Sequence, residues 1–160
     1  NFYQAISSFT GAARRLELVK HTEHVDIYKD FAHSPSKLKA TTSAFKSQFP
    51  NRPLVACMEL HTFSSLNASF LDQYDGAMAA ADFAIVYFNP KTIEHKKLPP
   101  LSAEQVRDAF GGSNLEVFTN SQALQERLQV MDWHERNLLL MTSGNFDGVD
   151  FVQLADALTT

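Results

Sequence analysis

Apolar residues along this chain form two kinds of pattern: short uninterrupted runs, and longer segments in which they recur every three or four positions. The uninterrupted runs cover residues 54–58, 83–88 and 138–141, and residues 115–118 are expected to form a further short strand. Runs this short and this apolar predict strands whose two faces are both buried in a parallel sheet. The segments between them have helical spacing, so strands and helices alternate from Tyr28 onward. This alternation predicts a Rossmann-like α/β fold, with a mostly parallel sheet and helices on both of its faces.

The first two predicted strands indicate a hairpin at the N-terminal end of this fold. Residues 16–19 and 25–28 form short apolar segments, and residues 22–24 between them are polar. Strands joined by so short a polar tip pair with each other in antiparallel fashion. We therefore expect one antiparallel pair beside the parallel strands.

Residues that commonly cap helices mark where several of the helices begin. Ser34 and Pro35 predict a helix that runs to about residue 48, with Ser34 as its cap and Pro35 in its first position. Ser102 and Gln105 have the spacing of a capping box, and the helix that follows them is expected to end at Gly111. The remaining segments are expected to be helices around residues 70–78, 120–131 and 151–158, and a basic, proline-containing loop at residues 89–100.

Composition and charge fit a single globular domain. The chain has 160 residues, of which 44% are apolar and 20% are charged, as in ordinary folded domains. Its net charge of −4 gives no electrostatic case for nucleic acid or an anionic membrane as the partner. The one cysteine, Cys57, lies in an apolar run, so we expect a buried thiol and a reducing cytoplasm. No apolar run approaches the roughly 20 residues that a membrane span needs, and no signal peptide opens the chain.

The N-terminal residues indicate a piece of a longer protein. The chain begins at Asn1 rather than at a methionine, and its first ten residues have the apolar spacing of one helix face, from Phe2 to Phe9. We expect residues 1–10 to be the tail of a preceding domain and residues 11–160 to be one domain.

Several familiar chemical motifs are absent from the sequence. It holds no glycine-rich loop with a lysine for nucleotide phosphates, no G-x-G-x-x-G turn, and no G-x-S-x-G elbow of a serine hydrolase. His21 and His24 stand near each other at the hairpin tip, but no cysteine or cluster of acids joins them. A zinc site needs three or four converging ligands. We therefore expect two surface histidines there and no metal site.

Polar residues that follow the predicted strands are the candidates for a ligand site. Asp30 and His33 lie between a strand and a helix start, a place where open α/β sheets bind ligands, and anions above all. Further polar side chains follow the other strands: Glu59, His61, Thr62, Ser64, Ser65, Asn89, Lys91, Ser143, Asn145 and Asp147. In a doubly wound sheet all these loops open on one edge. Loops of this kind are usually polar, so ordinary solvated residues are the alternative interpretation.

Three segments together resemble the C-terminal domain of Mur ligases. Residues 9–17 (FTGAARRLE) resemble the F-x-G-x-x-x-R-x-E start of that domain, and residues 28–35 (YKDFAHSP) resemble its D-[YF]-[AG]-H-x-P motif at the usual distance. Residues 140–148 (LMTSGNFDG) are similar to the M-S-N-G-x-F-G-G end of one branch, the UDP-N-acetylmuramate:L-alanyl-γ-D-glutamyl-meso-diaminopimelate ligases. The resemblance covers nearly the whole chain in the order of its elements.

The resemblance implies the substrate-delivering domain of a three-domain enzyme that forms an amide bond with ATP and Mg²⁺. In such enzymes a carboxylate of the sugar substrate, here expected to be UDP-N-acetylmuramate, becomes an acyl phosphate that the incoming amine attacks. The phosphate loop and the magnesium ligands belong to the central domain, so no catalytic residue or metal ligand is expected in this domain. The N-terminal and central domains of the same chain are the expected partners, and the fragment alone should be inactive.

On this resemblance each candidate residue has an expected role. Asp30 would hold the ATP ribose, Arg15 would reach a nucleotide phosphate as a bidentate donor, and His33 would lie between the nucleotide and the incoming substrate. The residues expected to face that substrate are His61, Ser143, Asn145 and Phe146.

One position departs from the pattern of muramate-adding ligases. Those enzymes usually carry an arginine in the loop after the second parallel strand, whereas this chain has no arginine between residues 54 and 106, and Thr62 occupies the corresponding position. A peptide remains the expected amino substrate. An L-alanine-adding ligase is the alternative within the family, and a non-catalytic α/β binding domain is the alternative outside it.

Overall fold

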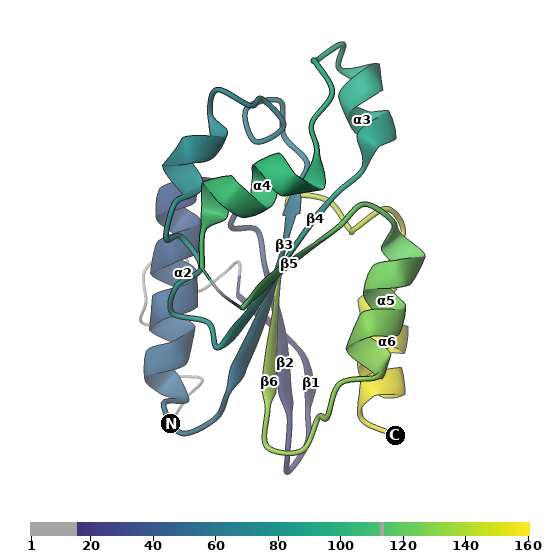
Figure 1. Ribbon diagram of the computed structural model, residues 1–160. Coiled ribbons are helices and arrows are strands. Elements are labelled where there is room, and N and C mark those ends of the chain that lie inside the picture. The colour runs from purple at the N-terminus through teal and green to yellow at the C-terminus, as the bar shows by residue number, and fades with distance from the viewer. Residues whose placement is uncertain (1–15, 113) are drawn as a thin grey trace.

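The computed structural model describes residues 16–112 and 114–160, and its centre is a six-stranded sheet (Figure 1). The strands are β1 (Glu17–His21), β2 (Asp26–Asp30), β3 (Leu54–Leu60), β4 (Phe83–Phe88), β5 (Leu115–Phe118) and β6 (Asn137–Met141). Their order across the sheet is β1-β2-β6-β3-β4-β5. β1 pairs antiparallel with β2, and every other neighbouring pair is parallel. The predicted mostly parallel sheet with an N-terminal hairpin is confirmed.

The register of the central strands places their carboxyl ends at one level. Asp30 on β2 pairs with Met141 on β6, and Met58 on β3 pairs with the same Met141. Neighbouring strands lie only ~4.8 Å apart. The loops that follow β2, β6 and β3 therefore leave the sheet side by side, close enough for their side chains to meet.

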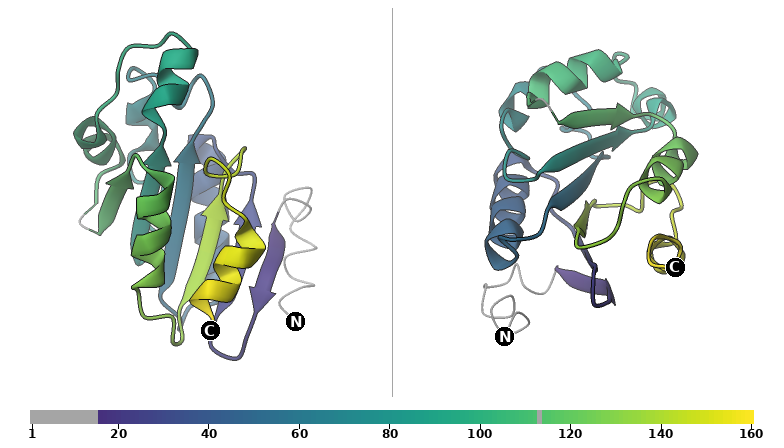
Figure 2. Two further views of the ribbon diagram at one scale, coloured as in Figure 1. Left: turned by 90° about the vertical axis from the view of Figure 1, so that its right-hand side faces the viewer. Right: turned by 60° about the horizontal axis from the view of Figure 1, so that its bottom comes forward.

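Helices cover both faces of the sheet (Figures 1 and 2). One face is covered by α2 (Pro35–Gln48), the short 3₁₀ turn η2 (Leu71–Tyr74) and α4 (Ala103–Phe110), and the other by α5 (Ser121–Gln129) and α6 (Phe151–Leu158). The first group forms an apolar core that includes Phe45 and Val106, and the second forms a core that includes Leu128 and Leu154. A further short helix, α3 (Pro90–His95), projects beyond the carboxyl ends of the strands.

The start of α2 follows the prediction in position but not in its capping contact. Pro35 occupies the first turn, where its missing N–H costs nothing. Ser34 directly precedes the helix, yet its side chain makes no capping hydrogen bond, so that part of the prediction is wrong. Leu38, Thr42 and Phe45 are buried. Packing of this face, rather than a cap, holds the helix in place.

Two predicted elements are wrong in type. Residues 70–78 form η2 and further turns instead of a regular helix. Gly76 has a positive φ of 74° and donates its N–H to Phe110 O at 3.1 Å, which turns the chain away from a helical path. Part of the expected loop at residues 89–100 forms α3, because the Asn89 side chain caps it by accepting the N–H of Lys91 at 2.9 Å.

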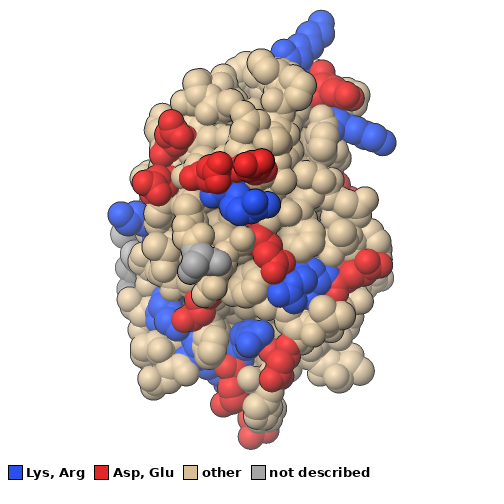
Figure 3. All heavy atoms as spheres, in the orientation of Figure 1, with Lys and Arg blue, Asp and Glu red and all other residues tan. Residues whose placement is uncertain are grey.

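Charged side chains of both signs are interspersed over the face shown in Figure 3. That face therefore offers no single-sign field of the kind that attracts nucleic acid. Within the described ranges, no helix is long and apolar enough to cross a membrane.

Candidate functional site

Thr142 joins the loops that meet at the carboxyl edge of the sheet. It directly follows β6, and its backbone N–H donates to Asp30 O at 3.0 Å. Its hydroxyl donates to Glu59 Oε1 on β3 at 2.5 Å. The ends of β2, β6 and β3 are thus connected through one buried residue, and the candidate site is built around it.

The turn between β2 and α2 carries the predicted pair Asp30 and His33. Asp30 is only 7% exposed, and its Oδ2 accepts the N–H of Ala32 at 2.8 Å. Nδ1 of His33 lies 2.9 Å from Phe31 O. A carbonyl oxygen can only accept, so Nδ1 carries the proton of this bond. The carboxylate and the imidazole therefore have fixed orientations beside the positive N-terminal end of α2.

Tyr74 supports this turn from the covering layer. Its hydroxyl donates to His33 O at 2.6 Å, and its ring stacks on Phe110 with centroids 4.8 Å apart. Burial raises the pKa of the Tyr74 hydroxyl, so it stays protonated and remains a donor at neutral pH. No local pattern predicts this contact, because residues 70–78 were expected only as a helix.

A small pocket opens beside Asp30. The residues that line it are Glu17, Lys29, Asp30, Phe31, Thr142, Gly144 and Phe151. Phe31 is 51% exposed, which is unusual for a large apolar side chain. The turn after β2 and the turn after β6 therefore border the same hollow.

Glu59 has an environment that the sequence did not predict. It was expected in an open loop, but it lies within β3 and is 1% exposed. Its Oε1 accepts the hydroxyl of Thr142 and, at 2.9 Å, the backbone N–H of Phe146. An acid at the end of an apolar run was the only available signal for a buried, bonded carboxylate at the sheet edge.

His61 packs against the turn that follows β6. Its Nδ1 lies 3.7 Å from Glu59 Oε2, and its side chain is 41% exposed. A Cβ added at Gly144 would stand 3.3 Å from His61 Cδ2 and 3.3 Å from Glu59 Oε1. Such distances are tight, so the close approach of the backbone at Gly144 to His61 requires glycine or a shift of the ring.

The turn after β6 is held in one shape by its own contacts. Phe146 and Asp147 both have positive φ, 54° and 61°. The Asn145 side chain accepts the N–H of Gly148 at 2.9 Å, and Ser121 on α5 donates its hydroxyl to Phe146 O at 2.7 Å. Left-handed residues other than glycine are costly, so these contacts stabilise an otherwise unfavourable backbone.

Asp147 anchors the far side of the same turn. Its Oδ2 accepts the Tyr87 hydroxyl and, at 3.1 Å, the side-chain N–H of Asn89. Burial, and then the hydrogen bond and negative charge of Asp147, raise the pKa of Tyr87, so its hydroxyl is a lasting donor. The turn is therefore tied to β3, β4 and α5 at once.

The predicted substrate-facing residues of this turn have different environments. Asn145 is exposed and Ser143 is half-buried at the open edge. Phe146 is 1% exposed, and its ring packs near Tyr87 and Phe151 in the core. The left-handed backbone at residues 146 and 147 accompanies this inward direction, so the ring of Phe146 supports the turn and does not face the edge.

Thr62, at the position where an arginine was expected, closes a local turn. Its hydroxyl donates to Ser65 Oγ at 3.0 Å, and Ser65 Oγ lies 3.0 Å from Thr62 O. The loop after β3 is thereby folded back on itself.

The remaining predicted residues lie outside the site. Arg15 and residues 1–10 fall outside the described ranges. His24 Nδ1 bonds Glu135 Oε2 at 2.9 Å, and His21 bonds Asp26, at the opposite end of the sheet. Among residues 16–112 and 114–160, no group of three His, Cys, Asp or Glu side chains is placed to hold a metal ion.

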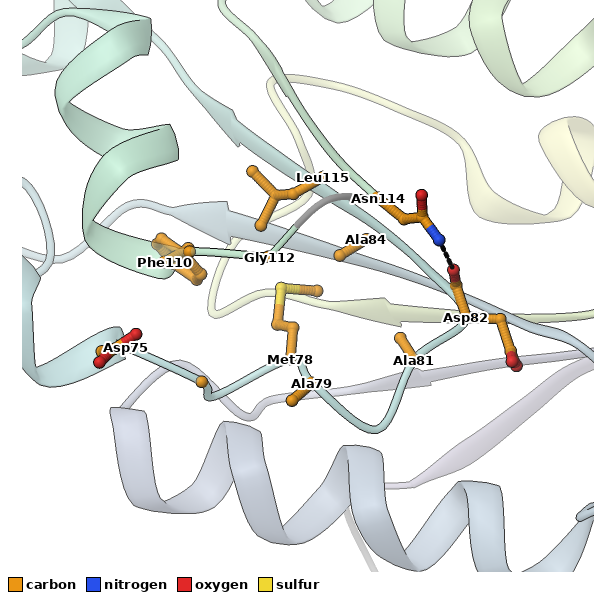
Figure 4. Close-up of a pocket in the computed structure, with 12 residues that line it drawn as sticks. Asp75, Met78, Ala79, Ala81, Asp82, Ala84, Phe110, Gly112, Asn114 and Leu115 are labelled. Carbon is orange, nitrogen blue, oxygen red and sulfur yellow. Dashed lines mark hydrogen bonds between the residues drawn. The ribbon is translucent and has the colours of Figure 1, made fainter.

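A second, larger hollow lies at the other end of the sheet (Figure 4). Asp82 and Asn114 stand at its rim, where β4 and β5 begin, and Met78 and Phe110 form its apolar side. Asn114 Nδ2 donates to Asp82 O at 3.2 Å. Because the hollow lies at the amino ends of the strands, it contains none of the predicted site residues.

Residues 14–145 match the protein family described as "Mur ligase, glutamate ligase domain". Two similar curated proteins are UDP-N-acetylmuramate–L-alanine ligases. The one from Acidithiobacillus ferrooxidans is 30% identical over 71% of this chain, and the one from Cutibacterium acnes is 31% identical over 77% of it. The alignments cover 24% and 26% of those two proteins. This chain therefore spans about a quarter of the length of the relatives it matches.

Two solved structures with a similar fold come from proteins described as ligases. A murein peptide ligase from Psychrobacter arcticus superposes with a TM-score of 0.68 at 21% identity, over 97% of this chain and 32% of that one. A domain described as coming from a UDP-N-acetylmuramate:L-alanyl-γ-D-glutamyl-meso-diaminopimelate ligase of Haemophilus ducreyi gives a TM-score of 0.61 at 20% identity, over 91% and 98% of the two chains. These similarities confirm the Rossmann-like α/β fold.

Proposed function

Because the chain belongs to the Mur ligase family, through the glutamate ligase domain that matches residues 14–145, we propose that it delivers the amino substrate in an ATP-dependent peptidoglycan-precursor ligase. The full enzyme would join UDP-N-acetylmuramate to a peptide through an amide bond. Residues 11–160 would be its C-terminal domain, and residues 1–10 would belong to the domain before it. A bacterial cytoplasmic location belongs to the same proposal.

The observation that carries this proposal is the meeting of two loops around one pocket. Asp30, from the turn after β2, and Gly144, from the turn after β6, line it together. The first loop carries the residues proposed for the nucleotide, and the second carries those proposed for the amino substrate. An enzyme that joins an activated acid to an amine has to bring those two ligands together, and this edge offers neighbouring positions for both.

ATP is the proposed co-substrate, and this chain would supply part of its contacts. Asp30 lines the pocket and its carboxylate suits a ribose hydroxyl. His33 would stand between the nucleotide and the substrate, and Arg15 would meet a phosphate. Mg²⁺ would be bound mainly by the central domain, and we assign no magnesium ligand to this chain.

The proposed reaction has two steps. The γ-phosphoryl group of ATP is transferred to the carboxylate of UDP-N-acetylmuramate, giving an acyl phosphate and ADP. The amine of the incoming compound then attacks the acyl carbon, and phosphate leaves as the amide bond forms. In this scheme His61, Ser143 and Asn145 bind and orient the incoming compound.

A peptide is the proposed amino substrate, and L-alanine is the alternative. The turn after β6 leaves Ser143, Gly144 and Asn145 at the edge, where several neutral hydrogen bonds of about 0.5–1.5 kcal/mol each can add up to discrimination. The alternative has support from the names of the relatives from Acidithiobacillus ferrooxidans and Cutibacterium acnes, which are L-alanine ligases.

ATP-dependent ligation by the full-length protein tests the proposal. The assay compares kcat/KM for L-alanyl-γ-D-glutamyl-meso-diaminopimelate with kcat/KM for free L-alanine, each with UDP-N-acetylmuramate. We expect the tripeptide to be preferred and residues 1–160 alone to be inactive. A clear preference for L-alanine would establish the alternative substrate. Absence of ligation with every amino compound would favour a non-catalytic binding domain.

A further inference from the structure

Glu59 is a buried carboxylate for which the proposed chemistry has no role. It is 1% exposed at the carboxyl edge, in a strand whose other residues are apolar. Burying an acid is costly unless its oxygens are hydrogen-bonded. The burial of Glu59 beside the candidate edge therefore has to be explained by the groups that its two oxygens contact.

One oxygen of Glu59 holds both ends of the turn after β6. Oε1 accepts the Thr142 hydroxyl at 2.5 Å and the Phe146 N–H at 2.9 Å. The same hydroxyl oxygen of Thr142 accepts the N–H of Gly144 at 2.8 Å. A continuous chain of hydrogen bonds therefore runs from Gly144 through Thr142 to Glu59 and back to Phe146. It encloses Ser143, Gly144 and Asn145, the part of the turn that lies at the edge.

The other oxygen of Glu59 is directed toward the neighbouring loop. Oε2 lies 3.7 Å from His61 Nδ1. The opposite side of the ring meets Gly144, where an added Cβ would stand 3.4 Å from Nε2. The same carboxylate thus contacts the imidazole and the turn that the imidazole packs against.

We propose that Glu59 is a positioning residue for the incoming amino substrate, because it fixes the spacing between the His61 ring and the turn of residues 143–145. This inference rests on the proposed function and deepens it. Glu59 does not touch the substrate. It acts through the Thr142 hydroxyl and the Phe146 N–H on one side and through His61 on the other, and it thereby determines which amino compound fits between them.

A purely structural role predicts a different outcome from a positioning role. If Glu59 only stabilised the fold, its replacement would lower thermal stability and affect all substrates alike. If it positions the amino substrate, the KM of that substrate changes and the KM values of ATP and UDP-N-acetylmuramate do not. The turn after β2, which carries Asp30, keeps its own bond from Ala32 in either case.

The test measures steady-state kinetics of the full-length enzyme with Glu59→Gln. Glutamine has nearly the same shape and can still accept both hydrogen bonds, but it removes the charge beside His61. We expect the KM of the amino substrate to rise about tenfold, a change that corresponds to about 1.4 kcal/mol. The other two KM values and the melting temperature should change little. Glu104→Gln, at an exposed position in the first turn of α4, is the matched control and should leave all three KM values unchanged.

Two substitutions at Thr142 make the test independent of how well Glu59→Gln folds. Thr142→Val keeps the shape and removes the hydroxyl that links Gly144 to Glu59, so it should also raise the KM of the amino substrate. Thr142→Ser keeps the hydroxyl and should retain a KM near that of the unmodified enzyme. A similar rise for both Thr142 variants, or for all three substrates, would overturn the inference.

The failure of this inference is distinguishable from failure of the proposed function. An unmodified enzyme that ligates, combined with Glu59→Gln and Thr142→Val variants of unchanged amino-substrate KM, overturns the positioning role alone. An unmodified full-length protein that ligates no amino compound overturns the proposed function and this inference with it.

Discussion

Single carboxylates determine how the candidate edge is organised. Asp30, Glu59 and Asp147 each accept hydrogen bonds from a loop backbone or from buried side chains. Bonds to ionised acceptors are about twice as strong as neutral ones. Each acid therefore fixes a short piece of chain, and exchanging one of them should have a local effect that can be measured separately.

Asp30→Asn should weaken the use of ATP without unfolding the domain. The amide keeps an oxygen that accepts the N–H of Ala32, but it loses the negative charge proposed to hold the ribose. We expect the apparent affinity for ATP in the full-length enzyme to fall by roughly 1.5–3 kcal/mol. The melting temperature serves as the control. An unchanged KM for ATP in a ligating enzyme would show that Asp30 has no role in nucleotide binding.

Tyr87→Phe should destabilise the protein by about 1 kcal/mol. The ring is buried and keeps its packing, so the loss is that of the hydroxyl bond to Asp147. Urea unfolding measures the change in free energy. In an Asp147→Ala background the same substitution should have little effect, because the acceptor is already gone. A full effect in that background would mean that the hydroxyl stabilises the fold through something other than Asp147.

The sequence predicted where most residues of the candidate edge lie but not the direction of their side chains. Asp30 and His33 could be placed because a strand end and a helix start are local patterns. Glu59 and Phe146 could not, since burial of an acid depends on donors from Thr142 and the backbone far along the chain. The inward direction of Phe146 accompanies left-handed backbone at residues 146 and 147, a conformation that is rare for a bulky residue such as phenylalanine.

At the scale of elements, several structures encoded within a few residues were identified from the sequence. A structure that depends on contact with a distant segment was not. Strand runs and the capping box at Ser102 and Gln105 were identified because each is encoded within a few residues. The helix expected at residues 70–78 failed because the chain turns at Gly76, whose N–H is bonded to α4. α3 was missed because lysines and prolines at residues 89–100 suggested a loop, although Asn89 and Pro90 are good helix-start residues.

Caps on two helices offer a matched comparison. Asn89 caps α3 and also bonds Asp147, whereas Asn120 caps α5 by accepting the N–H of Ala123 at 2.9 Å. Replacement of either by alanine should cost about 1 kcal/mol of unfolding free energy. Only Asn89→Ala should also speed hydrogen exchange in the turn after β6, because that turn loses one of its anchors. Equal exchange rates in both variants would contradict the role of Asn89 as an anchor.

At the scale of the whole molecule, one buried thiol and two tyrosine hydroxyls make the free energy of unfolding decrease at alkaline pH. Burial is the largest cause of a raised pKa for Cys57, Tyr74 and Tyr87, whose ordinary values are 9.0 for the thiol and 10.0 for the hydroxyls. In the unfolded chain these groups lose protons at lower pH than in the folded protein. Their contribution to stability is therefore complete below about pH 9 and decreases as pH rises further.

Cys57→Ala should raise the pH at which the free energy of unfolding begins to decrease. The thiol is the first of the three to ionise in the unfolded chain, so the variant should keep its unfolding free energy constant up to about pH 10 instead of about pH 9. Urea unfolding at a series of pH values checks this, with the variant's value at pH 7 as its own reference. Parallel curves for the variant and the unmodified protein would rule out the thiol as the source.

The position of β6 in the sheet has a consequence for how the protein is made. β2 and β3 are neighbours of β6 on either side and do not pair with each other. During synthesis the ribosome releases β2 and β3 long before residues 137–141, so both strands wait with unpaired inner edges. Exposed strand edges invite aggregation, and pairings between distant segments form slowly. The nascent chain is therefore most exposed to aggregation in the interval before β6 emerges, and the candidate edge forms only when that strand is inserted.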